Sequence, residues 1–436
     1  MNKKLRSLLG VSVIALLTVM LAACGSSDES ANGEGEVNIQ YWHMQVEEDR
    51  VAVIDDLISD FEKENPGITV DQVAIQEDDF STKISASLGA QQMPALLEVV
   101  VDQSLFLGKE GVLATELHKE IISNIGEDQY FDGPLNITKS PNDDGYYGVP
   151  VSGWVQGIWY RKDLFEEKGL EAPTTWENIL AAAKAFHDPD NKQYGMVIGT
   201  SEDEFAEQTF SQFALSNNSN VFDPNGDVTF NTDGMIEALD YYKNLAQYTP
   251  PGAESWREAR DLYISENTPM VMYSSYLMSD LVAEGLADKT GFTLPEKKQP
   301  ASFGEVTSLA ISNTVSEEKQ KAAKKFIEFV MKKENYINYL HMSPGGSNPT
   351  IASIAEDPKY LENEVLKAYG DEATKIASGL NNLQRFGFTE GVLYPEMGDI
   401  SAKVIIGKGI FDMTVEDKTP KEVAEQAQTS MEDTVK

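Results

Sequence analysis

The sequence of 436 residues contains one cysteine, Cys24, and only four histidines. A single cysteine cannot form an intramolecular disulfide, and it excludes a zinc site built from several thiolates. The histidines are far apart in sequence and none belongs to an HExxH motif, so we expect neither a metal nor a cofactor. Residues 223–227 faintly resemble a calcium loop but lack its terminal glutamate, and a hairpin turn between Phe222 and Val228 explains them better.

Basic residues are also scarce. The chain has 35 Lys and Arg against 71 Asp and Glu, which gives a formal charge of −36. Nucleic acid would require a basic face to neutralise phosphates, and an anionic lipid surface would require a polybasic patch, so neither is an expected partner. Hydrophobic residues make up 41% of the chain, which is typical of a globular protein of about two to four domains at this length.

Catalytic motifs are missing as well. The sequence has no Walker loop, no dinucleotide-binding glycine motif and no Gly-x-Ser-x-Gly elbow. Pairs of carboxylates could serve glycoside chemistry, but among 71 acids such pairs arise readily by chance. We therefore expect a protein that is not an enzyme.

The N-terminus has the pattern of an export signal. Lys3, Lys4 and Arg6 precede an apolar run over residues 8–20 and a short stretch of small residues. Later in the chain no stretch approaches 18 uninterrupted apolar residues, the length expected of a membrane-spanning helix. The interpretation is a signal peptide over residues 1–23, with export across the membrane.

The residues around Cys24 resemble a bacterial lipobox, Leu-Ala-Ala-Cys-Gly, in which the cysteine is lipidated and becomes the first mature residue. Several acyl chains would anchor the protein stably to the cell membrane, facing the extracytoplasmic side. An incidental cysteine is the alternative. Residues 24–36, rich in Gly and Ser, are expected to form a flexible tether. Loss of residues 1–23 removes three positive charges and no negative ones, so the formal charge falls to −39. We interpret this excess as a solubility feature and not as a signature of a cationic substrate.

Strand and helix patterns alternate at the start of the body. Residues 37–42, 68–75 and 95–101 have strand patterns, and residues 51–64 and 80–91 have helical spacing of apolar residues. This βαβαβ order predicts a doubly wound α/β sheet. Further along we predict strands over residues 151–160, 270–273 and 302–311, helices over 176–186, 319–333 and 419–435, mostly helix over 203–284, and a loop over 335–349.

One stretch of the middle of the chain resembles a known family. Tyr147-Gly148-Val149-Pro150, the run Gly157-Ile158-Trp159-Tyr160-Arg161-Lys162-Asp163-Leu164-Phe165, and Thr175-Trp176-Glu177 resemble the signature of family 1 extracellular solute-binding proteins. These are sugar-binding lipoproteins of ABC importers related to maltose-binding protein. The resemblance implies a periplasmic-binding-protein-like fold of type II: two doubly wound α/β lobes joined by crossing strands, with a ligand cleft between them. The lobes would comprise residues 37–152 plus 304–345 and residues 153–303 plus 346–436.

The resemblance also implies a function. Such a protein captures a mono- or oligosaccharide in the cleft, closes around it and delivers it to the permease subunits of an ABC importer, without covalent chemistry and usually as a monomer. Two alternatives stay open. A secreted carbohydrate-processing enzyme would use cleft carboxylates, for which Asp102 and Glu305 are the candidates. A receptor for a phosphorylated polyol would need converging cations, of which the candidate site offers only Arg385.

A sugar cleft needs aromatic faces for the apolar sides of the rings and planar polar groups for the hydroxyls. Ligands of open α/β sheets bind near the ends of strands. His43 and Gln45 follow the first strand, and Asp102 with Gln103 follows the third. Asp102 could instead cap a helix.

The remaining candidates come from the crossing strands and the second lobe. Trp154 stands where the maltose-binding branch has an acid, a departure that leaves the substrate open, and Tyr276 matches a stacking aromatic of the family. Glu305 begins a crossing strand, and a charge there is costly unless it faces the cleft or a partner. The other expected site residues are Trp256, Gly345, Gly346, Arg385 and Tyr394.

Overall fold

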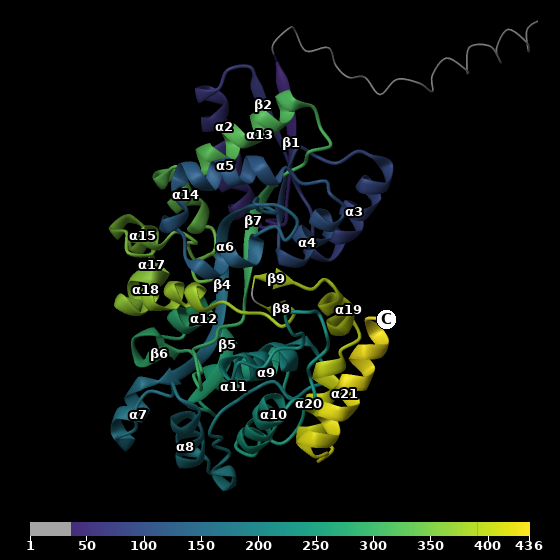
Figure 1. The fold of residues 1–436 in the computed structure, drawn as a ribbon. Helices are drawn as coiled ribbons and strands as arrows, with labels where there is room; N and C mark the ends of the chain where they lie inside the picture. Colours follow the sequence, from purple (N-terminus) through teal and green to yellow (C-terminus); the bar gives the residue numbers. More distant parts are fainter. Residues whose placement is uncertain (1–35, 390) are drawn as a thin grey trace, which may run out of the picture.

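The computed structural model describes residues 36–389 and 391–436, so the predicted signal peptide, Cys24 and almost all of the predicted tether lie outside it. The chain forms a mixed α/β structure with a seven-stranded sheet in the order β2-β1-β3-β7-β4-β5, and β6 also pairs with β4. Figure 1 shows the N-terminal elements gathered at one end of the molecule and helices α9 to α11 at the other. In the part of the chain that the structure describes, no helix is long and apolar enough to cross a membrane.

The first part of the sheet is parallel. Strands β1 (Val37–His43), β2 (Ile68–Ala74) and β3 (Leu96–Val99) pair in the order β2-β1-β3. Helix α2 (Glu48–Glu64) connects β1 to β2, and α3 (Glu77–Ala90) connects β2 to β3. The predicted βαβαβ unit is confirmed, because alternating and helical apolar spacings each bury one face of their element.

Strand β4 (Val149–Arg161) joins the two ends of the molecule. Its first half pairs with β7 (Gly304–Ile311), and its second half pairs with β5 (Met270–Ser274) and β6 (Thr290–Thr293), always antiparallel. Strand β7 in turn pairs with β3. One sheet therefore runs from the end that holds β1 and β2, called the first half from here on, to the end that holds β5 and β6, called the second half, and β4 and β7 are the crossing strands.

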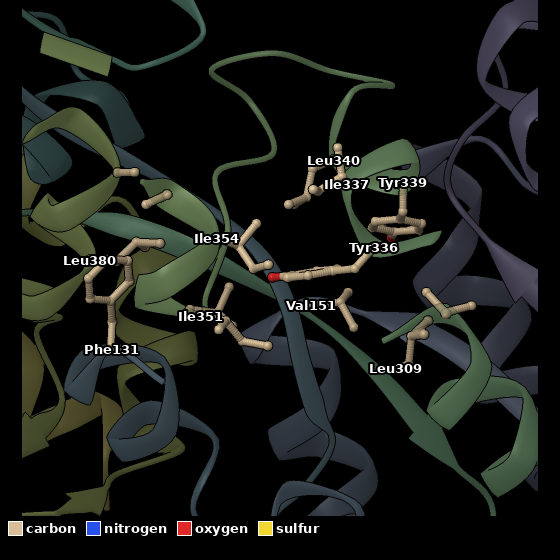
Figure 2. Close-up of a cluster of buried hydrophobic side chains, with 14 of the residues drawn as sticks. Phe131, Val151, Leu309, Tyr336, Ile337, Tyr339, Leu340, Ile351, Ile354 and Leu380 are labelled. Atoms are coloured by element: carbon tan, nitrogen blue, oxygen red, sulfur yellow. The ribbon is translucent and has the colours of Figure 1, made fainter. Parts of the chain in front are cut away.

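A third segment crosses beside β4. The backbone amides of Gly153 and Asn348 each donate to the other residue's carbonyl oxygen, at 3.0 and 2.8 Å. Next to this crossing, the Tyr336 hydroxyl accepts from the Thr350 amide at 2.9 Å. Figure 2 shows the Tyr336 ring extended among apolar side chains that include Val151 and Ile351. The crossing region is thus a packed part of the core.

Two helices begin at capping residues that are recognisable in the sequence. The Thr175 hydroxyl accepts from the Asn178 amide at 3.2 Å at the start of α8 (Trp176–Phe186), as the sequence predicts. Thr419 and Glu422 form a reciprocal capping box at the start of α21 (Pro420–Thr434).

One predicted loop is wrong in part. Helix α14 (Lys333–Leu340) occupies the beginning of the stretch 335–349 that the sequence analysis assigned to a loop. Four of its side chains, Tyr336, Ile337, Tyr339 and Leu340, are buried in the core, and this packing stabilises the helix. The irregular segment begins only at the helix end.

The remaining elements are mostly helices. Their bounds are α4 (Val101–Lys109), α5 (Thr115–Ile125), α6 (Asp132–Thr138), α7 (Lys162–Lys168), α9 (Glu204–Ser216), α10 (Asp233–Ala246), α11 (Trp256–Ile264), α12 (Leu277–Ala283), α13 (Glu317–Val330), α15 (Ala352–Ala355), α16 (Pro358–Leu361), α17 (Glu364–Tyr369), α18 (Asp371–Ser378), α19 (Glu396–Ala402) and α20 (Ile405–Thr414), with the two-stranded β8 (Phe388–Thr389) and β9 (Val392–Leu393).

Candidate functional site

A pocket of about 460 Å³ lies between α4 of the first half and helices α9 and α19 of the second. Aromatic and polar side chains share its walls. The lining includes Asp102, Phe106, Lys109, Glu204, Glu207, Gln208, Ser211, Phe303, Arg385, Tyr394 and Asp399. Such a mixture of aromatic faces and polar groups in a concave site is typical of small-molecule binding sites.

Arg385 lines this pocket and pairs with two acids. Its Nη1 donates to the two carboxylate oxygens of Glu305 at 3.0 and 3.2 Å, and its Nη2 lies 3.4 Å from Asp102 Oδ2. The guanidinium also lies over the Phe303 ring, 5.4 Å from its centroid. Burial by itself would lower the pKa of Arg385, but the carboxylates of Asp102 and Glu305 raise that pKa above its ordinary value. The guanidinium is therefore a permanently charged bridge between two acids.

The Glu305 carboxylate accepts hydrogen bonds from several groups. Besides Arg385, it accepts from the backbone amides of Val101 and Val306 at 3.0 and 3.2 Å. Val101 begins α4, so the Glu305 carboxylate ties strand β7 to the start of that helix. The cost of placing a charge at this position is offset by the hydrogen bonds from these three donors.

Asp102 and Gln103 lie in the first turn of α4, directly after β3. The alternative of Asp102 as the N-cap is wrong, because the N-cap is Val100. Gln103 instead accepts from the Val100 amide at 3.1 Å. The Asp102 side chain is largely exposed and faces Arg385 across the pocket.

Two further predicted residues, Trp154 and Tyr276, are not among the side chains that line the pocket, but their rings extend from Phe303, which lines it. Trp154 lies opposite Glu305 in the β4–β7 register, so the two side chains share a face of the sheet. The Trp154 ring centroid is 5.7 Å from that of Phe303 and 6.4 Å from that of Tyr276. Tyr276 is 46% exposed, which is unusual for a large aromatic side chain. Aromatic rings thus continue from the pocket toward the third crossing.

Gly345 and Gly346 lie at this third crossing. A Cβ on Gly346 would come within 2.1 Å of the Tyr276 ring, so only glycine permits the close approach. The Gly345 carbonyl accepts from Ser275 Oγ at 2.5 Å and from Asn348 Nδ2 at 2.8 Å. Gly346 supports the Tyr276 ring, whereas the Gly345 carbonyl is engaged within the protein.

His43 occupies a different position from the one predicted. It is the last residue of β1, not a loop residue, and it is completely buried. Its Nε2 lies 2.9 Å from Gln72 Oε1, and its ring packs on Tyr41. The structure therefore places His43 in the core under the sheet edge and not on the pocket wall.

Gln45 lies in the loop after β1. Its side-chain amide donates to Glu98 Oε1 at 2.9 Å, and its carbonyl accepts from Arg50 Nη1 at 3.1 Å. Of the other expected residues, Tyr394 lines the pocket and packs against Phe222, with the two ring centroids 5.2 Å apart. Trp256 begins α11, where its ring stacks on Arg257, and it is not among the side chains that line the pocket.

Helix α9 contributes side chains to the pocket that were not predicted from the sequence. Glu207, Gln208 and Ser211 face the pocket from this helix. Burial raises the pKa of Glu207 to about 7, although a hydrogen bond from Ser401 Oγ at 2.6 Å opposes the shift. A carboxyl of this kind can donate or accept a hydrogen bond near neutral pH.

A second missed residue is Glu98, the one charge in the apolar run of β3. It is fully buried, and its Oε2 accepts from the hydroxyls of Tyr41 and Tyr339 at 3.3 and 2.7 Å. A lone acid inside a buried strand was the signal that could have identified it.

Among the described residues, no group of three or more His, Cys, Asp or Glu side chains could hold a metal ion. The calcium-like segment is a turn. Phe222 and Val228 form an antiparallel bridge, and the Asp223 carboxylate accepts from the amides of Asn225 and Asp227 at 2.8 and 3.0 Å.

Comparison with known proteins places these features in context. Residues 46–337 match the family described as bacterial extracellular solute-binding protein. YcjN of Escherichia coli (strain K12), named as a periplasmic-binding protein of an ABC transporter, is 36% identical over 404 residues, which cover 93% of this chain and 94% of YcjN.

Solved structures share the fold. The sugar-binding protein MalE of Xanthomonas citri superposes with a TM-score of 0.74 at 18% identity and covers 92% of this chain and 97% of its own. An ABC transporter solute-binding protein of Agrobacterium radiobacter K84 in complex with ribitol superposes with a TM-score of 0.68 at 20% identity, covering 91% of this chain and 98% of its own. At these identities the likeness concerns the fold alone.

Proposed function

This chain belongs to the bacterial extracellular solute-binding protein family, and we propose that it captures a sugar or a polyol in the pocket between its two halves. The observation that carries the proposal is the pocket itself. Aromatic faces from Phe303 and Tyr394 stand beside the planar polar groups of Arg385, Asp102 and Gln208. Pyranose rings and polyols present both apolar C–H surfaces and hydroxyls, and this set of side chains complements both.

Relatives support the choice of ligand class. The Agrobacterium protein of the same fold was solved with ribitol, a polyol. The Xanthomonas protein is named as a sugar-binding protein. Both ligand classes are uncharged and rich in hydroxyls, which suits a pocket in which Arg385 already holds two carboxylates.

The lobe boundaries form part of the proposal. We assign residues 37–152 plus 304–345 to one lobe and residues 153–303 plus 346–436 to the other. The exchange of strand partners along β4 and the bridge between Gly153 and Asn348 support a division near these positions. Hinge closure of the lobes would then bury the ligand.

In the cell, the loaded protein would deliver its ligand to the permease subunits of an ABC importer. Export through the signal at residues 1–23 and lipidation of Cys24 would hold a monomer at the outer face of the cell membrane. A Cys24→Ser variant is expected to appear in the culture medium. Retention of that variant in the membrane fraction would contradict the anchor.

The two alternatives have less support. Glycoside hydrolysis by Asp102 and Glu305 would need an acid and a base with independent roles, whereas both carboxylates bind the same guanidinium. A phosphate group would need a free cation. Arg385 is neutralised by those acids, and the second lining cation, Lys109, shares the pocket with Glu204, Glu207 and Asp399, so acids outnumber cations there.

A thermal-shift screen of sugars, polyols and sugar phosphates tests the proposal. Ligand binding stabilises the folded protein, by about 2.7 kcal/mol at a hundredfold excess over Kd. We expect a neutral sugar or polyol to raise the melting temperature and to be recovered unchanged after long incubation. Stabilisation by sugar phosphates alone, or release of reducing ends from a glycoside, would contradict the proposal.

A further inference from the structure

Two glutamines form a buried amide pair beside the pocket. Gln156 lies in β4 and Gln212 in α9, and their side chains are 1% and 0% exposed. Gln212 Nε2 donates to Gln156 Oε1 at 2.6 Å. Gln212 Oε1 is also buried, and it has no hydrogen-bond partner among the described residues. A buried polar atom without a partner lowers stability, so two apolar side chains would suit the core better at this position.

Gln156 is bonded to the segment that carries an aromatic wall of the pocket. Its backbone amide donates to the Phe303 carbonyl at 2.7 Å, and its own carbonyl accepts from Ser302 Oγ at 2.9 Å. Phe303 lines the pocket, where the Arg385 guanidinium lies 5.4 Å from the centroid of its ring. The main chain of Gln156 therefore holds the Phe303 segment in place.

Gln212 belongs to the helix that forms another wall. The side chains of α9 that line the pocket follow the spacing of one helix face, and they are Glu204, Glu207, Gln208 and Ser211. Gln212 lies one turn beyond Gln208, at the inner end of this face. Elsewhere α9 packs against α10 and α20 (Figure 1). In the described part of the chain, the bond from Gln212 to Gln156 is the one hydrogen bond that joins α9 to β4.

We propose that Gln156 and Gln212 are positioning residues for ligand binding, and that their amide pair sets the separation between the α9 wall and the Phe303 ring. The inference rests on the proposed function, because it requires a sugar or polyol that contacts both walls. Gln208 and Ser211 can bind the hydroxyls of a ligand that lies on Phe303 only if the two walls stay within about 0.5 Å of the right separation. A hydrogen bond fixes both a distance and a direction, which apolar packing does not. The cost of the unpaired oxygen is thus exchanged for a defined pocket.

Replacement of both glutamines by methionine tests the inference. The double variant Gln156→Met/Gln212→Met keeps side chains of similar length and removes both amides, including the unpaired oxygen. Loss of both partners of a buried hydrogen bond is nearly neutral or stabilising, whereas loss of one partner leaves the other unsatisfied. We therefore expect the double variant to unfold at the same urea concentration as the wild type or at a higher one. Each single variant should unfold at a lower concentration.

The affinity of the double variant should change in the opposite direction. The probe is the neutral sugar or polyol that stabilises the wild type most in the thermal-shift screen, with glucose, maltose and ribitol included in that screen. Calorimetric titration should show a Kd at least fivefold weaker for the double variant than for the wild type. Gln320→Met is the matched control, because it removes a half-buried amide that donates to the carbonyls of Val315 and Asn313 in the first half. This control should change the Kd less than twofold.

The outcomes separate the two proposals. A double variant that binds the probe as tightly as the wild type overturns the inference and leaves the proposed function standing. The same holds if stability and affinity fall together in the double variant, or if Gln320→Met weakens binding equally, because a general loosening of the fold then accounts for the loss. If no neutral sugar or polyol of the screen binds the wild type, the proposed function fails and the inference fails with it.

Discussion

Arg385 and Asp102 form an ion pair across the pocket, with Arg385 Nη2 3.4 Å from Asp102 Oδ2. The two residues are 283 positions apart, one in the first turn of α4 and the other in the segment before β8. The same guanidinium binds Glu305 on the crossing strand β7. One side chain thereby joins the first half, the second half and the strand that connects them.

Removal of this guanidinium should destabilise the fold. Arg385→Met leaves the Glu305 carboxylate without its cation in a site where it is largely buried. We expect a loss of about 3 kcal/mol in the free energy of unfolding, measured by urea denaturation. Arg260→Met is the matched control, because Arg260 also pairs with two carboxylates but is more exposed, and it should cost about 1 kcal/mol or less. Equal losses in the two variants would contradict the structural role of Arg385.

Glycine at the crossing of the strands is a second requirement. A Cβ on Gly304 would lie 2.2 Å from the backbone oxygen of Trp154, the neighbour of its β4 partner, Val155. Gly304→Ala should therefore disturb the β4–β7 pairing and destabilise the protein by about 2 kcal/mol or more. Gly89→Ala adds the same atom where nothing lies within 4 Å, inside α3, and should stabilise by about 0.5–1 kcal/mol. Thermal unfolding of both variants measures the difference in sign.

A buried histidine makes stability depend on pH. His118 Nδ1 donates to the Tyr146 carbonyl at 2.8 Å, and its Nε2 accepts from the Ile311 amide at 2.7 Å, which only the neutral ring can do. Burial lowers the pKa of His118 to about 4. Between about pH 4 and 6.5 the unfolded chain binds more protons than the folded one, so this contribution to stability is complete above pH 6.5 and is lost as the pH falls.

The comparison with a His118→Gln variant isolates this effect from the titration of the many acids. Relative to that variant, the wild type should lose about 2 kcal/mol of unfolding free energy between pH 7 and pH 4.5. Urea denaturation at both pH values gives the difference. If the difference in unfolding free energy between the wild type and the variant stays constant over this pH range, the lowered pKa of His118 is contradicted.

Glu207 should act in the opposite direction. Burial raises the pKa of this carboxyl to about 7, so the folded chain holds a proton that the unfolded chain releases above pH 4.5. The contribution of Glu207 to stability is present below pH 4.5 and is lost as the pH rises toward 7 and above. A Glu207→Gln variant should gain about 1–2 kcal/mol over the wild type between pH 5 and pH 8, measured by denaturation. If the difference in unfolding free energy between the two proteins does not change with pH, the raised pKa of Glu207 is contradicted.

Local patterns of the sequence predicted much of the fold. The alternation in residues 37–42 and the helical spacing in 51–64 agree with β1 and α2, because each pattern depends on neighbouring residues alone. The exchange of partners along β4 was not derivable in this way. Its pairings with β5, β6 and β7 join residues more than a hundred positions apart, and only the resemblance to a family implied crossing strands.

The residues of the candidate site were also only partly predictable from the sequence. Of the residues expected at the site, Asp102, Arg385 and Tyr394 line the pocket. Their contact with ligand stays a prediction. The helix at α9 was predicted but its contribution to the pocket was not, because its buried side chains include polar ones on several faces and leave no distinct polar stripe. His43 was placed on the pocket because the end of its strand lies one residue later than the pattern suggested.

The affinity of the best-binding sugar or polyol for a Trp154→Ala variant tests the central claim most directly. The Trp154 ring lies beside both Phe303, which lines the pocket, and Tyr276. Calorimetric titration should show at least a tenfold weaker Kd than for the wild type, while Tyr194→Ala, at a surface pocket between η2 (Pro189–Asn191) and the end of α20, binds as the wild type does. An unchanged Kd in a folded Trp154→Ala protein would contradict the claim that this pocket and the adjoining rings of Trp154 and Tyr276 bind the ligand.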